Sequence, residues 1–76
     1  MKQEQFFNAV LMSLNVDYLN TESDFELMVN SPISLAEKTE KTKGFLTKLV
    51  EIENNINKFK VLFVKEEDKK EEENNG

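Results

Sequence analysis

The stretch FLTKLVEIENNINKFKVLFV, residues 45–64, decides the fold, because it fits either one long helix or two strands. On the helix interpretation, its apolar residues recur at alternating steps of four and three, the spacing of a coiled-coil seam. On the strand interpretation, KFKVLFV alternates apolar and charged residues, and NNIN forms the loop of a β-hairpin. The helix is favoured, because the first arm, TKLVEIE, alternates poorly and NNIN lacks the glycine of short hairpin turns.

The predicted helix carries an apolar seam with a polar border. Lys48, Glu53 and Lys60 flank this seam, as residues in contact with water would. The seam residues are Phe45, Leu49, Ile52, Ile56, Phe59 and Phe63.

The long helix has a predicted start and a predicted weak point. Two starts are possible: Ser31 can cap a helix that has Pro32 at its first position, and Ser34, followed by Glu37 three residues later, matches a capping box. We expect the helix to run from about Ser34 to Lys65, a length of roughly 45 Å at 1.5 Å per residue. Gly44 is the weak point, because glycine is about 1 kcal/mol worse than Ala inside a helix.

Two shorter helices are predicted upstream. The first covers residues 3–15 and is expected to end near Asn15. Thr21 then precedes several acidic residues, as an N-cap residue does at the positive end of a helix dipole. Phe25 and Met28 share a face after it, which predicts a short helix over residues 22–30. The apolar face of the first helix consists of Phe6, Phe7, Val10, Leu11 and Leu14.

The predicted fold class is therefore all-α, with a short N-terminal helix, a short middle helix and a long C-terminal helix in a small helical bundle or helical hairpin. Residues 1–64 form one small domain, and the highly charged residues 65–76, KEEDKKEEENNG, are expected to be a disordered acidic tail. The alternative is an α+β fold with a C-terminal β-hairpin over about residues 47–64.

The composition argues against catalysis. The 76 residues include no Cys, His or Trp, and all ten basic residues are Lys. Thiol chemistry is excluded, and the usual general base and zinc ligand is missing. Carboxylates or lysines would need a sizeable pocket to retune their pKa values, which so short a chain would struggle to build. We expect no enzyme activity and no cofactor.

Outside the acidic tail, carboxylates gather in one predicted loop, around the expected start of the middle helix. Asp17, Asn20, Glu22, Asp24 and Glu26 could in principle hold a hard cation. Their spacing is not that of an EF-hand, and no glycine stands at a sharp turn. Helix capping explains them better, so no metal site is predicted.

The net charge of -5 excludes several partners. An acidic chain without Arg repels nucleic acid and anionic membranes, so direct binding to either is not expected. Neither a signal peptide nor an apolar run of membrane-spanning length is present, which predicts a cytoplasmic protein. The excess of Lys, Asn, Glu, Ile and Phe suggests AT-rich coding, as in low-GC bacteria, their phages or plasmids.

The seam suggests a function in protein–protein interaction. Upstream helices of roughly 20 and 13 Å would barely cover it, and uncovered apolar area usually marks an interface. We therefore expect a non-enzymatic interaction module that self-associates or docks on a protein partner through Phe45 to Phe63, as a small assembly, scaffolding or regulatory factor. The alternative is an acidic inhibitor that occupies the nucleic-acid-binding surface of a host protein. No small-molecule substrate is expected.

Overall fold

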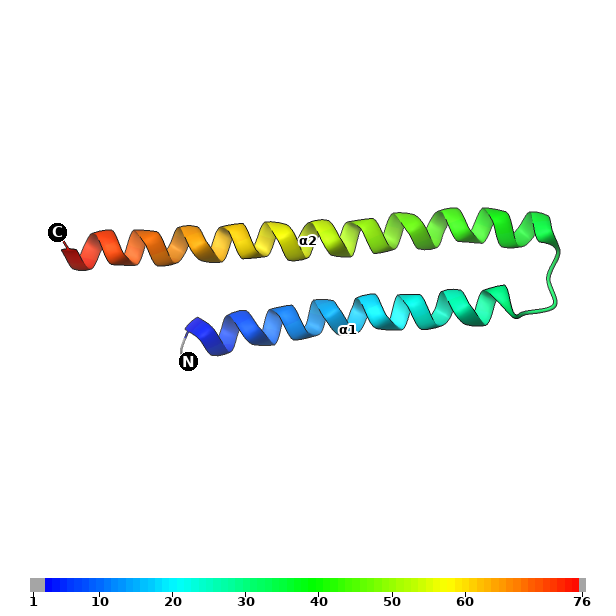
Figure 1. The fold of residues 1–76 in the computed structure, drawn as a ribbon, viewed down its shortest axis with the longest axis horizontal. Helices are drawn as coiled ribbons and strands as arrows, with labels where there is room; N and C mark the ends of the chain where they lie inside the picture. The colour runs from blue at the N-terminus through cyan, green and yellow to red at the C-terminus, as the bar shows by residue number, and fades with distance from the viewer. Residues whose placement is uncertain (1–2, 76) are drawn as a thin grey trace.

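The computed structural model is an antiparallel hairpin of two long helices (Figure 1). Helix α1 spans Gln3–Val29 and helix α2 spans Leu35–Asn75, with residues 30–34 connecting them. The structure describes the backbone of residues 3–75 and the side chains of residues 3–65. The hairpin measures 63 × 19 × 10 Å. Its radius of gyration of 18.1 Å far exceeds the roughly 11 Å of a compact chain of this length.

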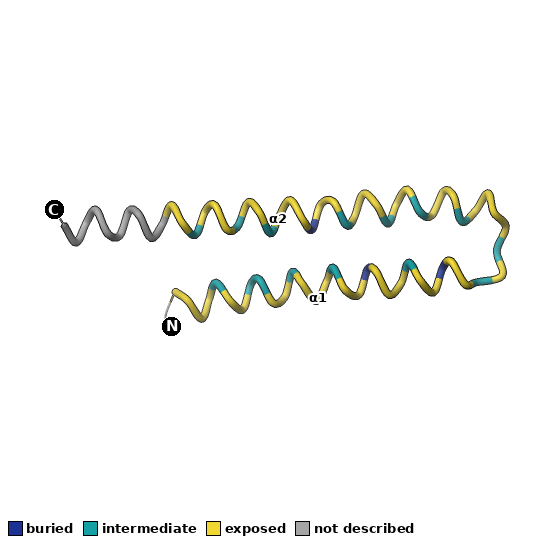
Figure 2. Tube along the Cα trace, viewed as in Figure 1, coloured by how far each residue is buried: buried dark blue, intermediate teal, exposed yellow. Residues whose placement is uncertain are grey.

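The less exposed residues of each helix lie on the side turned toward the other helix (Figure 2). The seam of α1 follows the same alternation of four and three as that of α2, and its members are Phe7, Leu11, Leu14, Tyr18, Thr21, Phe25 and Met28. Of the residues whose side chains are described, only Thr21, Met28 and Ile52 are buried. The rest of both seams is half-buried. The core is therefore a single line of contacts that stays open along both of its sides.

The prediction of two short upstream helices is wrong, because α1 is continuous from Gln3 to Val29. The chain does not leave the helix near Asn15, and Thr21 caps nothing. Instead, the Thr21 hydroxyl donates a hydrogen bond to the carbonyl oxygen of Asp17 at 2.7 Å, within the same helix. Thr21 thereby occupies a seam position without leaving a buried polar group unpaired.

The β-hairpin alternative is also wrong. Residues 45–64 lie entirely within α2, and no strand occurs among residues 3–75. The helix continues through Gly44, which keeps a negative φ. The predicted disorder of the acidic tail concerns residues 65–76. Nearly all of these lie outside the described side chains, so that prediction stays untested.

Local hydrogen bonds explain where the connection begins and ends. The Ser31 hydroxyl donates to the carbonyl oxygen of Met28 at 2.6 Å, which holds the chain against the last turn of α1. At the other end, the amide of Glu37 donates to the Ser34 hydroxyl at 3.1 Å. Ser34 is thus the N-cap of α2, and Pro32 lies in the connection before the helix.

Candidate protein-interaction surface

All six residues predicted as the seam of α2 face α1. Ile52 is buried, with 7% of its surface exposed, and the other five are half-buried. The expectation of a barely covered seam assumed short upstream helices and is corrected by α1, which extends along the whole seam (Figure 1). The seam therefore has a partner within its own chain. Contact of the same residues with a second protein stays a prediction.

Aromatic contacts fix the register of the two helices. Near the chain ends, the ring centroid of Phe7 lies 4.1 Å from that of Phe63 and 5.4 Å from that of Phe59. Near the connection, Phe25 meets the edge of Phe45 at 5.7 Å. The residue numbers of the pairs Phe7–Phe63 and Phe25–Phe45 each add up to 70. A residue of α1 therefore lies level with the α2 residue whose number completes this sum.

One long side of the hairpin carries exposed apolar residues from both helices. Leu19 lines a shallow depression together with Leu49 across the seam. Leu46 and Val50 lie on the same side of α2, one turn apart and next to Leu49, and Met12 lies two turns before Leu19. We call Met12, Leu19, Leu46 and Val50 the Leu19 face; their exposed fractions are 67, 60, 56 and 53%.

The opposite side of the hairpin is polar in the middle. There, polar side chains of both helices surround the buried Thr21 and Ile52; they are Asp17, Asn20 and Asp24 of α1, and Lys48, Glu51 and Asn55 of α2. Toward the connection this side opens into an apolar depression with a floor of Met28, Ile33 and Phe45, which we call the turn pocket. The two long sides therefore offer different chemistry.

Tyr18 joins the helices on the side of the Leu19 face. Its hydroxyl donates a hydrogen bond to the Glu53 carboxylate, with 3.2 Å between the oxygens. This hydrogen bond, together with desolvation and the negative charges of Glu53 and Glu22, raises the pKa of Tyr18 above its ordinary value of 10.0. The neutral phenol is favoured because ionisation would place a second negative charge beside Glu53.

This shift predicts a pH dependence that can be read from one chromophore, because Tyr18 is the only tyrosine and the chain has no Trp. The folded-state pKa is raised, so the stability from this contact is present below the unfolded pKa of about 10 and is lost as the pH rises through the folded pKa. Titration of the phenolate absorbance should show Glu53→Gln lowering the pKa. The control Glu51→Gln changes the same charge on the polar side and should leave it in place; equal effects of both variants would contradict the assignment.

The carboxylates weighed as a metal site are divided between the two sides. Asp17 and Asp24 lie on the polar side, whereas Glu22 and Glu26 lie beside Leu19. Helix geometry accounts for the separation, because successive residues of a helix are rotated by about 100° and carboxylates spread over several turns fall on different sides. Among the residues that the structure describes, no group of three or more His, Cys, Asp or Glu side chains is placed to hold a metal ion.

Neither helix, over its described residues, contains a segment long and apolar enough to cross a membrane. Comparison with protein-family models, with curated proteins and with solved structures finds no match to this chain. A proposal for the function therefore rests on the exposed residues of the hairpin.

The Leu19 face could be found only in part from the sequence. Met12 and Leu19 stand seven residues apart, the spacing of a stripe along one side of a helix, but Asn15 and Glu22 interrupt that stripe. The face becomes visible when the antiparallel register brings two apolar residues of α2 beside it. Because each helix supplies only two of the four residues, neither helix alone carries a clear signal.

Proposed function

We propose that this protein is a non-enzymatic interaction module that self-associates through the Leu19 face. Two hairpins stack on this face to form a four-helix bundle, the arrangement in which paired helical hairpins bury their apolar sides. The module then acts as a small assembly, scaffolding or regulatory factor. The observation that carries the proposal is the group of four exposed apolar residues, contributed by both helices to one side of the hairpin.

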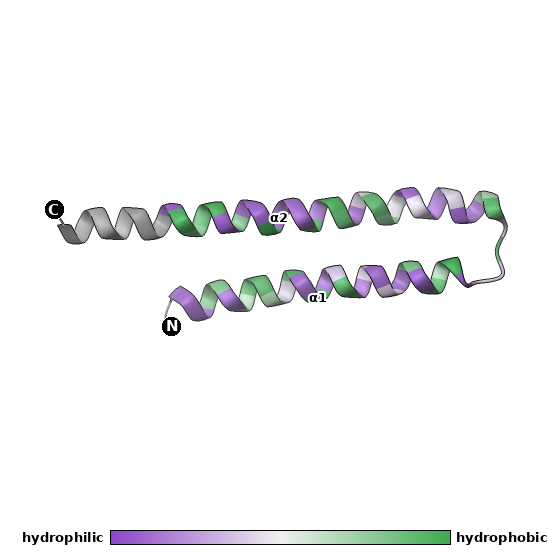
Figure 3. Ribbon diagram, viewed as in Figure 1, coloured by the Kyte–Doolittle hydropathy of each residue, from purple (hydrophilic) through white to green (hydrophobic). Residues whose placement is uncertain are grey.

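The exposed surface is larger than that of a compact chain, and much of it is apolar. Hydrophobic residues recur along both helices beyond their inner sides (Figure 3). The chain exposes 6203 Å², against roughly 4,800 Å² for a compact monomer of this mass. The excess of about 1,400 Å² follows from the elongated shape of the hairpin, 63 × 19 × 10 Å, in which no further helix covers either long side over the described residues.

Charged residues beside the Leu19 face favour one arrangement of the two copies. If the twofold axis runs parallel to the helices, α1 of one copy lies over α2 of the other at the same level. Leu19 then lies opposite Val50 of the second copy, because the register places these residues within one residue of the same level. Glu26 lies within one residue of the level of Lys43 of the second copy, whose ammonium group also pairs with Glu40 of its own helix. Apolar and oppositely charged residues therefore meet across the proposed interface.

Sedimentation equilibrium tests this proposal directly. The wild-type chain should have a mass near twice 8.9 kDa, and Leu19→Asp should return it to the monomer mass because a carboxylate would be buried in the apolar centre of the interface. The matched control is Leu27→Asp, which makes the same change on the same helix at a residue that is 71% exposed and lies off the Leu19 face. This control should stay dimeric.

Two outcomes would count against the proposal. A wild-type mass of 8.9 kDa at high protein concentration would remove self-association. A complex that weakens steeply as salt is raised would point to a charge-driven contact, because screening acts on exposed charges and hardly on apolar burial. Self-association would then rest on charged residues and not on the Leu19 face.

A further inference from the structure

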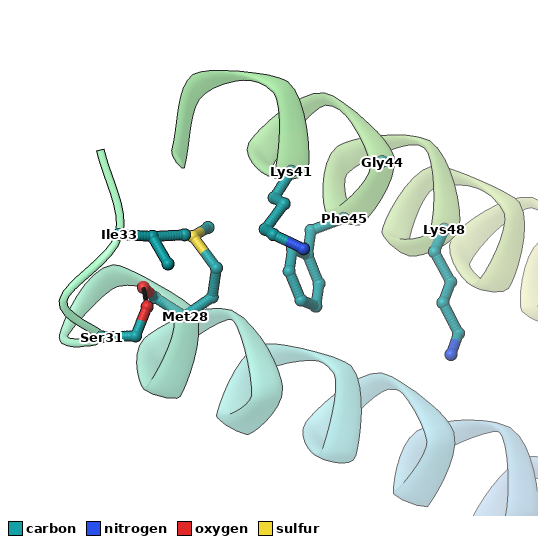
Figure 4. Close-up of a pocket in the computed structure, with 7 residues that line it drawn as sticks. All are labelled: Met28, Ser31, Ile33, Lys41, Gly44, Phe45 and Lys48. Carbon is teal, nitrogen blue, oxygen red and sulfur yellow. Dashed lines mark hydrogen bonds between the residues drawn. The ribbon is translucent and has the colours of Figure 1, made fainter. Parts of the chain in front are cut away.

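The turn pocket lies at the end of the hairpin opposite to the chain ends and on the side away from the Leu19 face. It is a depression of about 480 Å³, within the range of ligand and side-chain pockets. Met28 comes from α1, Ile33 from the connection and Phe45 from α2, and their side chains converge on it (Figure 4). The Ser31 hydroxyl is already bonded to the carbonyl oxygen of Met28. The floor of the pocket is therefore apolar.

Gly44 forms part of the wall of the turn pocket, at a position where the fold does not require glycine. Its φ is not positive, and a Cβ built on it would meet no atom within 4 Å. A glycine inside a helix costs about 1 kcal/mol relative to Ala. The structural effect of Gly44 is to leave the α2 backbone accessible beside Phe45, so another chain can approach closely there.

Two lysines border this opening. Lys41 precedes Gly44 by three residues and Lys48 follows it by four, so the three residues lie in one row on α2. Figure 4 shows both lysine side chains extending from α2 toward α1, one on each side of Gly44. Within the described part of the chain, neither ammonium group has a carboxylate at salt-bridge distance. Two positive charges about 10 Å apart along the helix thus enclose an apolar pocket on a protein of net charge -5.

We propose that the turn pocket binds an acidic amphipathic helix of a partner protein. A bulky apolar side chain of that helix enters the pocket over Gly44, and carboxylates one turn before and one turn after it pair with Lys41 and Lys48. The matching pattern on the partner is Glu-x-x-Leu-x-x-x-Glu or its reverse, because a helix lying along α2 must repeat the spacing of the two lysines. A pocket open to solvent suits a side chain on a helix, whereas a lipid chain would need a more enclosed cavity.

Fluorescence anisotropy with a synthetic peptide tests the proposal. The probe is a labelled Ala- and Gln-based helical peptide that carries one Glu-x-x-Leu-x-x-x-Glu motif, used with the full-length protein. Two control peptides replace Leu by Ala, or both Glu by Lys. The first should bind at least about tenfold more weakly, as expected for the loss of a central apolar anchor. The second should show no saturable binding, because its charges repel Lys41 and Lys48.

Protein variants locate the site. Gly44→Leu fills the opening with a good helix former and should weaken probe binding at least about tenfold, with helix content retained in circular dichroism. Lys41→Glu and Lys48→Glu should each weaken it about fivefold. Lys58→Glu makes the same charge change at an exposed position outside the pocket and should have no effect. Leu19→Asp, on the other face, should also leave probe binding unchanged, so this site can fail or succeed independently of self-association.

Three results would overturn the proposal. The first is absence of saturable probe binding at about millimolar protein, the weak limit of specific recognition. The second is equal weakening by Lys58→Glu and Lys48→Glu, which would show general charge attraction only. The third is tighter binding of dodecanoate below its micellar concentration, with loss of that binding in Gly44→Leu, which would assign the pocket to anionic amphiphiles instead.

Discussion

Ile52→Asp is expected to unfold the hairpin. Ile52 is the one buried residue of the α2 seam, and truncation of such a side chain to Ala already costs about 2 to 5 kcal/mol. A carboxylate at the same place loses that burial and must also be desolvated. A domain of this size has only about 3 to 5 kcal/mol of stability from its core. Far-ultraviolet circular dichroism at neutral pH should therefore show loss of most of the helical signal.

Asn54→Asp is the matched control for this variant. Asn54 lies two residues further along the same helix and is exposed, so its substitution adds the same charge on the outer side of α2. The helical signal and the urea midpoint should change little, by within about 0.5 kcal/mol. If Ile52→Asp retained the wild-type spectrum and midpoint, the packing of α1 on this seam would be disproved.

The contrast between Ile52 and Leu19 matters for any search for partners. A substitution at Ile52 changes folding first, so loss of binding by that variant says little about a docking surface. Leu19 is 60% exposed, and its substitution leaves the seam intact. Tests of self-association therefore belong on the Leu19 face, although the regular spacing of the six seam residues makes them the more prominent feature of the sequence.

Phe7→Ala is the second change expected to have a large effect. The Phe7 ring stacks on both Phe59 and Phe63, and it is half-buried. Removal of a fully buried Phe costs about 3 to 5 kcal/mol. Partial exposure reduces this, so we expect a loss of about 2 kcal/mol, of which the aromatic pairs account for about 1 kcal/mol. Urea unfolding followed by circular dichroism gives the change in free energy.

Phe6→Ala is the comparison for Phe7→Ala at the neighbouring position. Phe6 is 51% exposed and makes one edge contact with Phe59, at 6.1 Å between centroids. Its loss should lower the midpoint by less than half as much, with an unchanged urea slope for both variants. A larger effect at Phe6 than at Phe7 would show that the outer ring, and not the inner one, packs on α2.

The helical character of residues 45–64 could be predicted because six apolar residues keep one spacing without interruption. The same residues, from Phe45 to Phe63, face α1 in the structure. The cap at Ser34 was one of two predicted candidates, since Glu37 follows it three residues later and its amide donates the capping bond. The other candidate, Ser31 before Pro32, lies in the connection instead. Regular spacing and capping depend on residues close together in the chain, so they can be recognised in the sequence.

The continuity of α1 could not be predicted with the same rules. Its seam passes through Tyr18 and Thr21, and Thr21 is polar, so the run of apolar residues is broken after Leu14. The hydroxyl of Thr21 bonds to the Asp17 carbonyl, which lets a polar residue occupy a buried position. The one sign in the sequence that the seam continues is its alternation of four and three residues, which extends beyond Thr21 to Phe25. The short stretch rich in Asn and Asp therefore predicts a helix boundary, where the structure has a continuous helix.

The register of the hairpin has a consequence for how its ends behave. Phe25 and Phe45 close a loop of 20 residues, whereas Phe7 and Phe63 close one of 56. Loop-closure entropy rises with the logarithm of that length, so closing the outer pair directly costs about 1 kcal/mol more than closing the inner pair. Pairing that starts near the connection avoids this cost, because each new contact then adds only a few residues to a loop already closed. The aromatic rings near the chain ends lie where the helices would otherwise separate first.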